Sequence, residues 1–299
     1  MDRTLRGAAE MTTAMTILGT IGLFVVLSGQ GAIDVVFWRC AFGALALLII
    51  CAAQGLLQRR LTVRTLAIAA IGGVAIVVNW AMLFSAYTQS SIGVATAVYN
   101  TQPFILVGFG VLFLGERVTA TKVGWLAIAF LGVLLIVLAK PQTADYSGSH
   151  YALGIALSLG AAFFWAIAAL LTKKLTGTPP QLIALIQVCV GILMLAPFVS
   201  WTALPQGPTA WGALITLGAV HTGIMYILMY GAVQKLPTYL QGAFTFIYPV
   251  VAIFVDYAAF GHKLQAVQIA GAAAIIVAAM GMTFGWRLLR FRAQSATSH

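Results

Sequence analysis

The chain has 299 residues, of which 62% are hydrophobic and 7% are charged. So few polar side chains cannot cover a water-soluble globule of this length, which excludes a soluble enzyme or binding domain and predicts a protein surrounded by a lipid bilayer. The net charge of +10 comes from short basic clusters between apolar segments, so we assign it to lipid headgroups and expect no nucleic-acid partner.

Ten apolar stretches follow one another along the chain. Most have close to the ~20 residues that a helix needs to cross a hydrocarbon core. They lack the alternation of apolar and polar residues that is typical of barrel strands. Since only helices and closed barrels satisfy backbone groups in lipid, the sequence predicts an all-α integral membrane protein with ten transmembrane helices. Their approximate ranges are Met11 to Gly29, Val35 to Leu57, Leu66 to Tyr87, Ile92 to Leu114, Val123 to Ala139, Tyr151 to Thr172, Gln181 to Ala203, Ala210 to Val233, Thr238 to Phe260 and Ala266 to Trp286.

The basic residues predict the orientation of these helices. If the N-terminus is cytoplasmic, the outer loops hold Lys140 and Lys263, Arg39 lies inside the second helix, and the remaining 13 of the 16 basic residues lie on the cytoplasmic side. The positive-inside rule therefore predicts a multi-pass protein of the inner (plasma) membrane with both termini in the cytoplasm. The first apolar run is too long for a cleaved signal peptide, and we expect it to stay as a helix.

The two halves of the chain repeat each other. Pro103, in Tyr99-Asn100-Thr101-Gln102-Pro103, returns 146 residues later as Pro249, in Thr245-Phe246-Ile247-Tyr248-Pro249. Similarity at a fixed spacing indicates an internal duplication, with residues 1–145 as the first five-helix repeat and 146–299 as the second, which ends in a short basic tail. Because five is an odd number, the second repeat is inverted. In transporters built this way, substrate binds where the halves meet, and rocking of the halves alternates access.

Each proline lacks the N–H that would bond to the carbonyl four residues earlier, which frees the carbonyls of Tyr99 and Thr245. Two interpretations stay open: these carbonyls face a central cavity, or the prolines are packing kinks whose carbonyls find other partners. An amide that faces lipid loses its hydrogen bonds, so the amides nearby must point inward. We expect Asn100 to contact substrate and Asn79 to bond to a neighbouring helix.

Aromatic side chains gather on single faces of two predicted helices, and a further one lies in a third. Helical spacing places Trp80 and Phe84 on one face of the third helix and Tyr226 and Tyr230 on one face of the eighth, and the repeat superimposes the two pairs. Trp165 lies in the sixth helix. Taken singly, such residues face lipid or pack against other helices; taken together near the middle of the membrane, they predict the wall of an uncharged, aromatic substrate cavity.

Three ionisable residues within the spans are candidates for coupling or gating. Arg39 lies about five residues into the second helix, and we expect it to extend outward to the membrane interface, with an inward ion pair in the outer vestibule as the alternative. Asp256 lies near the outer end of the ninth helix, where we expect solvation or a pair with Lys263, with proton transfer as the alternative. His221 is early in the eighth helix, and we expect a hydrogen-bonded structural role.

The segment Pro103-Phe-Ile-Leu-Val-Gly-Phe-Gly-Val-Leu-Phe-Leu-Gly-Glu-Arg-Val-Thr119, with Arg39 early in the second helix, resembles the hallmark of the drug/metabolite transporter superfamily, EamA type. The resemblance implies ten helices, an inverted duplication and a small-molecule substrate, and within the superfamily it extends to aromatic amino acid exporters. We expect Glu116 of this segment to pair with Arg117 or to favour the start of the fifth helix. The second half departs from the pattern, with Gly261-His262-Lys263 in place of Gly-Glu.

These observations predict a transporter and not an enzyme, because P-loop, HExxH and GxGxxG patterns are absent. We expect an exporter of small neutral or zwitterionic metabolites, chiefly aromatic and other apolar amino acids, that acts as a facilitator. The alternative is a proton-coupled exporter of lipophilic drugs or nucleosides, with Asp256 as the proton carrier. We expect no cofactor and no metal, and a monomer is compatible with the sequence.

Overall fold

A computed structural model of the protein describes residues 2–89, 95, 98–138, 151–202, 204–260 and 266–287. These residues form helices joined by turns and contain no β-strand. The helices of the first half are α1 (Arg3–Gly19), α2 (Ile21–Ser28), α3 (Ala32–Ala53), the short η1 (Leu56–Gln58), α4 (Val63–Gln89), α6 (Gln102–Leu114) and α7 (Ala120–Leu138). Those of the second half are α8 (Tyr151–Lys174), α9 (Pro180–Leu195), η2 (Ala196–Phe198), α10 (Gly207–Gly218), η3 (Ala219–Ile224), α11 (Met225–Lys235), α12 (Thr238–Thr245), α13 (Ile247–Phe260) and α14 (Ala266–Thr283).

The helices have the dimensions that a bilayer demands. Six described segments are long and apolar enough to cross a membrane: Arg3–Ser28, Ala32–Ala53, Val63–Ala86, Ala152–Lys174, Pro180–Phe198 and Gly207–Lys235. The shorter apolar helices α6, α7, α13 and α14 account for the other predicted crossings. The prediction of an all-α membrane protein is therefore confirmed, and the described helices are compatible with ten crossings.

Several predicted helices are interrupted. The first breaks at Thr20 between α1 and α2, and the eighth contains a π-helical segment, η3. The fourth and ninth break at equivalent places, at Thr101 before α6 and at Phe246 before α13. Pro103 and Pro249 thus lie in the first turn of a new helix, where the missing N–H removes no helical hydrogen bond.

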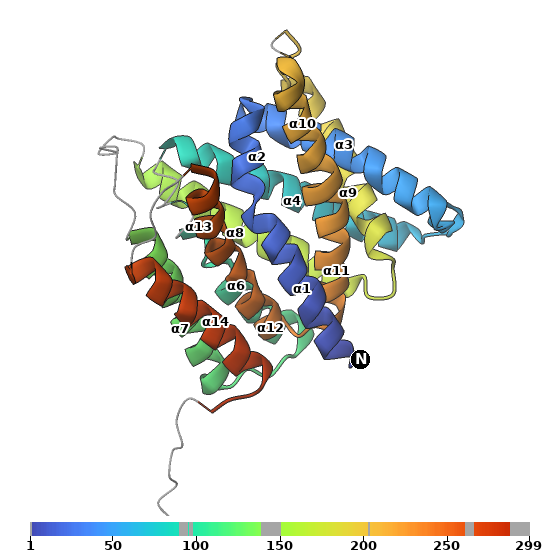
Figure 1. The fold of residues 1–299 in the computed structure, drawn as a ribbon. Helices are drawn as coiled ribbons and strands as arrows, with labels where there is room; N and C mark the ends of the chain where they lie inside the picture. The colour runs from blue at the N-terminus through green and yellow to red at the C-terminus, as the bar shows by residue number, and fades with distance from the viewer. Residues whose placement is uncertain are drawn as a thin grey trace, which may run out of the picture.

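The helices pair in a pattern that is preserved when the two halves are exchanged. α4 packs against α8 as its counterpart α11 packs against α1, and α3 packs against α10 as α9 packs against α4. Three further contacts join a predicted helix to its own counterpart: α3 packs against α9, α7 packs against α14, and α6 packs against α12, which brings the fourth predicted helix against the ninth (Figure 1). Such self-consistent pairing is what two inverted copies of one unit produce.

Both ends of the described chain lie on one side of the bundle. The N-terminus of α1 and the C-terminal end of α14 are at the lower edge of Figure 1. An even number of crossings requires this arrangement. The assignment of that side to the cytoplasm stays a prediction from the basic residues.

Glycines mark the closest approaches between helices. A Cβ added at Gly218 of α10 would lie 2.8 Å from the backbone nitrogen of Gly43 and 2.9 Å from the carbonyl carbon of Phe42, both in α3. Its repeat partner Gly72 lies against the Gln187 side chain of α9, and the neighbouring Gly73 lies against the Gln187 backbone. The repeat therefore preserves the small residues that let neighbouring helices touch.

Gly218→Ala is expected to destabilise the protein by about 1–3 kcal/mol, because the added methyl group meets backbone that cannot move aside. The midpoint of thermal unfolding in detergent micelles measures the effect. Gly212→Ala in the same helix is the matched control, since a Cβ there meets nothing within 4 Å. Equal midpoints for the two variants would contradict the close packing of α10 on α3.

Candidate functional site

A row of buried aromatic rings crosses the contact between the two halves. Trp80 of α4 lies edge-on to Tyr226 of α11, with ring centroids 5.7 Å apart, and Tyr226 lies edge-on to Tyr230 at 5.1 Å. The Tyr230 hydroxyl donates a hydrogen bond to Oε1 of Gln187 in α9. The structure thus brings together three residues that the sequence placed in the site. Phe84, one turn beyond Trp80, is half-buried against the same core.

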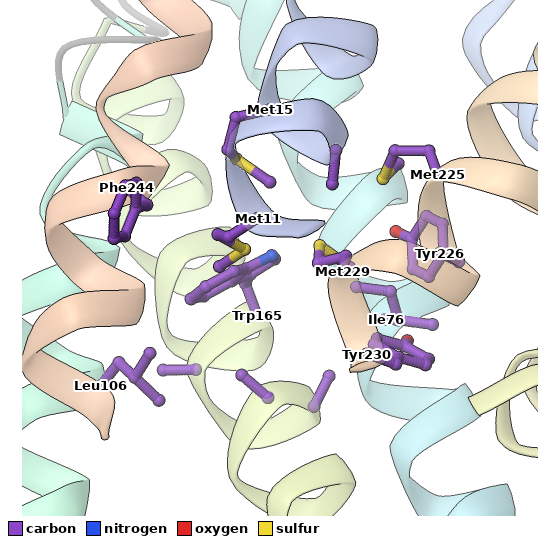
Figure 2. Close-up of a cluster of buried hydrophobic side chains, with 14 of the residues drawn as sticks. Met11, Met15, Ile76, Leu106, Trp165, Met225, Tyr226, Met229, Tyr230 and Phe244 are labelled. Carbon is purple, nitrogen blue, oxygen red and sulfur yellow. The ribbon is translucent and has the colours of Figure 1, made fainter. Parts of the chain in front are cut away.

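Methionines complete the centre of this cluster around Trp165 of α8. Met11 of α1 and Met229 of α11 lie beside the indole ring, Met15 and Met225 lie farther along the same cluster, and all five side chains are buried (Figure 2). A void of about 10 Å³ remains between Trp165, Met229 and Tyr230, which is room for about one water molecule. Flexible, polarisable methionine side chains adapt to ligands of different shape. The sequence analysis missed them, although each pair is spaced i, i+4 on one helix face.

Buried amides and the helix breaks lie beside this cluster. Asn79 Nδ2 donates to the carbonyl of Ala161 in α8 at 2.7 Å and to the Tyr99 hydroxyl at 3.2 Å, which confirms the predicted bond between helices. Asn100 Nδ2 donates to the Tyr248 hydroxyl at 3.1 Å and so joins the break of the fourth helix to that of the ninth. A substrate contact of Asn100 stays a prediction.

The other proline-break residues are also buried between the halves. Pro103 contacts α12, where a Cβ added at Gly242 would lie 3.0 Å from the Pro103 Cβ. The Thr245 hydroxyl donates within its own helix to the carbonyl of Gln241 at 2.9 Å, and Pro249 is buried in α13. The predicted residues of both breaks therefore lie at one junction between the halves.

Arg39 does not extend to the membrane interface, and that prediction was wrong. Only 2% of the residue is exposed. Its Nε donates to the Thr222 hydroxyl of η3 at 3.1 Å, and its guanidinium carbon lies 4.1 Å from the centroid of the Trp80 ring. The aromatic face and the hydroxyl hold the side chain inward. The sequence predicted an uncharged site. The structure instead places a buried cation beside the aromatic row.

His221 has the hydrogen-bonded setting that we expected. Its Nε2 lies 2.8 Å from the Thr20 hydroxyl, at the break between α1 and α2, and its Nδ1 lies 3.3 Å from the carbonyl of Thr216. A groove of about 620 Å³ opens beside it, lined by α1, α2, α10, η3 and α13. Asp256 belongs to α13, but its side chain lies outside the described residues, as does Lys263. In the described part of the chain, no group of three or more His, Cys, Asp or Glu side chains is placed to hold a metal ion.

A polar network ties helices together on the side of the bundle that carries the N-terminus. Glu116 Oε1 accepts a hydrogen bond from Lys173 Nζ at 2.7 Å, and Oε2 accepts bonds from the Thr238 hydroxyl at 2.6 Å and backbone N–H at 2.9 Å. Glu116 therefore joins the end of α8 to the start of α12. The pairing with Arg117 that the sequence suggested was wrong, because the fold brings Lys173 to Glu116 from 57 positions away.

A second ion pair secures the same turn between α11 and α12. Lys235 Nζ lies 2.5 Å from Oε2 of Glu10 in α1, and Lys173 also donates to the carbonyl of Leu236 at 2.7 Å. Gln241 Nε2 donates to the carbonyls of Val233 and Leu236 from within α12. Helices α1, α6, α8, α11 and α12 are thus tied together at one end.

Burial by itself raises the pKa of the Glu116 carboxyl. The hydrogen bonds from Lys173 and Thr238 and the positive charge of Lys173 outweigh that effect, so that the net pKa lies below its ordinary value. The carboxylate form is therefore favoured in the folded protein.

The chain is similar to known membrane transporters. The model of the family described as "EamA-like transporter family" matches it twice, over residues 6–138 and 152–284. An uncharacterized transporter, YxxF, of Bacillus subtilis is 30% identical over 284 residues, which are 92% of this chain and 88% of that protein. A protein of Salmonella typhimurium named "Probable amino-acid metabolite efflux pump" is 26% identical, over 66% of this chain and 69% of that protein.

Two further likenesses concern an exporter and a solved structure. The pseudopaline exporter CntI of Pseudomonas aeruginosa is 28% identical over 63% of this chain and 64% of its own length. A solved crystal structure superposes with a TM-score of 0.82 at 18% identity, covering 99% of this chain and 100% of the other. That structure supports the fold alone.

Lys173→Gln is expected to lower the stability of the protein at neutral pH by about 1–3 kcal/mol. The substitution removes the charged donor that Oε1 of the partly buried Glu116 carboxylate accepts from. Arg117→Gln is the matched control, since Arg117 is exposed and next to Glu116 in sequence. Thermal unfolding in detergent micelles measures both. A larger loss with Arg117→Gln would contradict the network.

The contribution of Glu116 also depends on pH. Because its folded pKa is depressed, the stability it adds is present above the unfolded pKa of about 4.3 and is lost as the pH falls through the folded pKa. Glu116→Gln should therefore be less stable than wild type at pH values well above that unfolded pKa, with the difference shrinking below it. A difference in unfolding midpoint that stays constant through the acid range would contradict the assignment.

Proposed function

This chain belongs to the EamA-like transporter family, and on that premise we propose that it exports small zwitterionic metabolites, chiefly aromatic and other apolar amino acids, out of the cell. One observation carries the proposal: a buried cluster of aromatic rings and methionines lies between the two halves, beside amides and a cation. This combination suits a solute with an apolar side chain and a polar end. The relative named as an amino-acid metabolite efflux pump supports the same direction and substrate class.

Each part of the cluster has a role in this proposal. Trp80, Tyr226 and Trp165 receive the apolar side chain of the solute, and the methionines adapt to its shape. Asn100 and the carbonyls of Tyr99 and Thr245 offer acceptors and donors for the ammonium group and the carboxylate. Because the cluster is closely packed, the halves must separate around a bound solute.

Alternating access follows from the network at one end of the bundle. With Glu116 bound to Lys173 and Glu10 to Lys235, the side that carries the N-terminus is closed. Access from that side requires both ion pairs to separate and the α11–α12 turn to move away from α6 and α1. The inverted halves then rock about the site between them.

The same set of residues supports a facilitator. Among the side chains that the structure describes, the buried polar ones are Arg39, His221, amides and hydroxyls, and none of them is a carboxylate. A proton-coupled carrier needs a side chain that binds and releases a proton during the cycle, and intramembrane carboxylates commonly fill that role. Transport should therefore run down the gradient of the solute.

Labelled phenylalanine should accumulate by counterflow in proteoliposomes preloaded with unlabelled phenylalanine, to the same extent with and without a pH gradient. The controls are liposomes without protein and proteoliposomes preloaded with buffer alone. Uptake that requires the pH gradient would contradict the facilitator, and no counterflow of any amino acid would contradict the substrate class.

Trp165→Leu should raise the KM for phenylalanine about ten-fold, which corresponds to about 1.4 kcal/mol of lost contact with the ring. Trp201→Leu is the matched control, because Trp201 is 55% exposed and lies outside the cluster. Initial rates of counterflow for both variants give the comparison. An unchanged KM in Trp165→Leu would remove this residue from the site.

A second function is favoured by the groove beside His221. Its walls are formed mainly by aliphatic and aromatic side chains, including Ile17, Leu23 and Phe24, which suits a proton-coupled exporter of lipophilic drugs. Such a carrier would move a hydrophobic cationic dye when a pH gradient is applied, and Asp256→Asn or His221→Gln would abolish that movement. Our proposal predicts no dye transport under these conditions.

A further inference from the structure

Arg39 is a buried cation within a membrane-spanning helix. Its segment, Ala32–Ala53, is one of those long enough to cross a bilayer. Guanidinium groups do not lose their proton in proteins, so this side chain keeps its positive charge at its 2% exposure. A charge at such a position is costly unless it is paired.

Among the residues that the structure describes, the side chains around Arg39 supply no negative charge. It contacts the Thr222 hydroxyl and the Trp80 ring, and the further groups near enough to act on it electrostatically are Tyr226, Cys40, Tyr99 and His221. None of these side chains is negatively charged near pH 7. The ion pairs formed among the described residues instead join Glu10 to Arg6 and Lys235, and Glu116 to Lys173.

The guanidinium keeps donors for a further ligand. Nε is bound to Thr222, and neither of the two terminal nitrogens hydrogen-bonds to a residue that the structure describes. The terminal nitrogens form the fork that binds both oxygens of one carboxylate. A carboxylate bound there would satisfy these donors and neutralise the charge in one step.

Arg39 also lies where the proposed solute would bind. The guanidinium rests on the face of Trp80, whose edge meets Tyr226 in the aromatic row. Through Thr222 it connects α3 of the first half to η3 of the second. A molecule whose ring lies against this row has its polar end within reach of the guanidinium.

We propose that Arg39 binds the carboxylate of the exported solute and thereby restricts the site to small organic acids, including amino acids. This inference rests on the proposed function and deepens it. Amides, amines and esters of the same size lack the negative charge and are discriminated against. The aromatic rings and methionines then select among the acids.

Two matched pairs of ligands test the proposal on the wild-type protein: phenylalanine with phenylalaninamide, and benzoate with benzamide. Binding is measured by intrinsic tryptophan fluorescence in detergent micelles at about pH 6, where the ammonium groups of the first pair are charged. We expect each acid to bind about ten- to a hundred-fold more tightly than its amide, as for loss of a charge-assisted hydrogen bond.

Variants then assign the preference to one side chain. Arg39→Gln should bind each acid and its amide with equal Kd, and Arg39→Lys should keep part of the preference because it keeps the charge but not the fork. Arg60→Gln is the matched control, since it removes the same charge from an exposed position. It should retain the full preference.

The outcomes separate this inference from the proposed function. Equal Kd values for acid and amide in the wild-type protein would overturn the role of Arg39, even if phenylalanine counterflow is observed. A preference for benzoate without binding of phenylalanine would support the carboxylate site and overturn the amino acid assignment. Failure of all four ligands to bind would overturn both. The ligand comparison needs no variant, so it holds even if Arg39→Gln does not fold.

Discussion

Because the bilayer core contains no water, every polar group within this chain must find its partner inside the helix bundle. The described residues meet much of that constraint through bonds between helices. Asn79 donates to a carbonyl of α8 and Asn100 donates to Tyr248, both across the two halves, and Tyr230 donates to Gln187 within the second half. Placing these groups inside the bundle leaves apolar surface toward the lipid.

The irregularities of the helices follow the same constraint. The break at Thr20 faces His221 in the π-helical η3, and the breaks before α6 and α13 meet through Asn100 and Tyr248. Backbone that departs from the α-helix is tolerated at membrane depth where protein or a cavity surrounds it. These are also positions where neighbouring segments can change their relation, since π-helical segments and broken helices occur frequently at functional sites.

The two halves differ in sequence at equivalent positions although they share one architecture. At the end that carries the N-terminus, Glu116 and Glu10 hold the α11–α12 turn through lysine partners. The position that corresponds to Glu116 in the second half is His262, which lies outside the described residues. An inverted duplication therefore supplies the symmetric scaffold, and side chains that the halves do not share make the halves different.

The sequence by itself determined the features that depend on local pattern and on lipid: helical structure throughout the described chain, ten crossings, the duplication, and the aromatic spacing of Trp80, Tyr226 and Tyr230. Hydrophobic length and helical period are enough for these, because a bilayer admits few alternatives. Only the tertiary structure decided which distant side chains meet. It turned Arg39 inward onto Trp80, gave Glu116 to Lys173 in place of Arg117, and gathered four methionines into the buried cluster that contains Trp165. Each of these contacts joins helices far apart in the chain, and their packing angles and depths are fixed by the fit of whole surfaces, which no local pattern encodes.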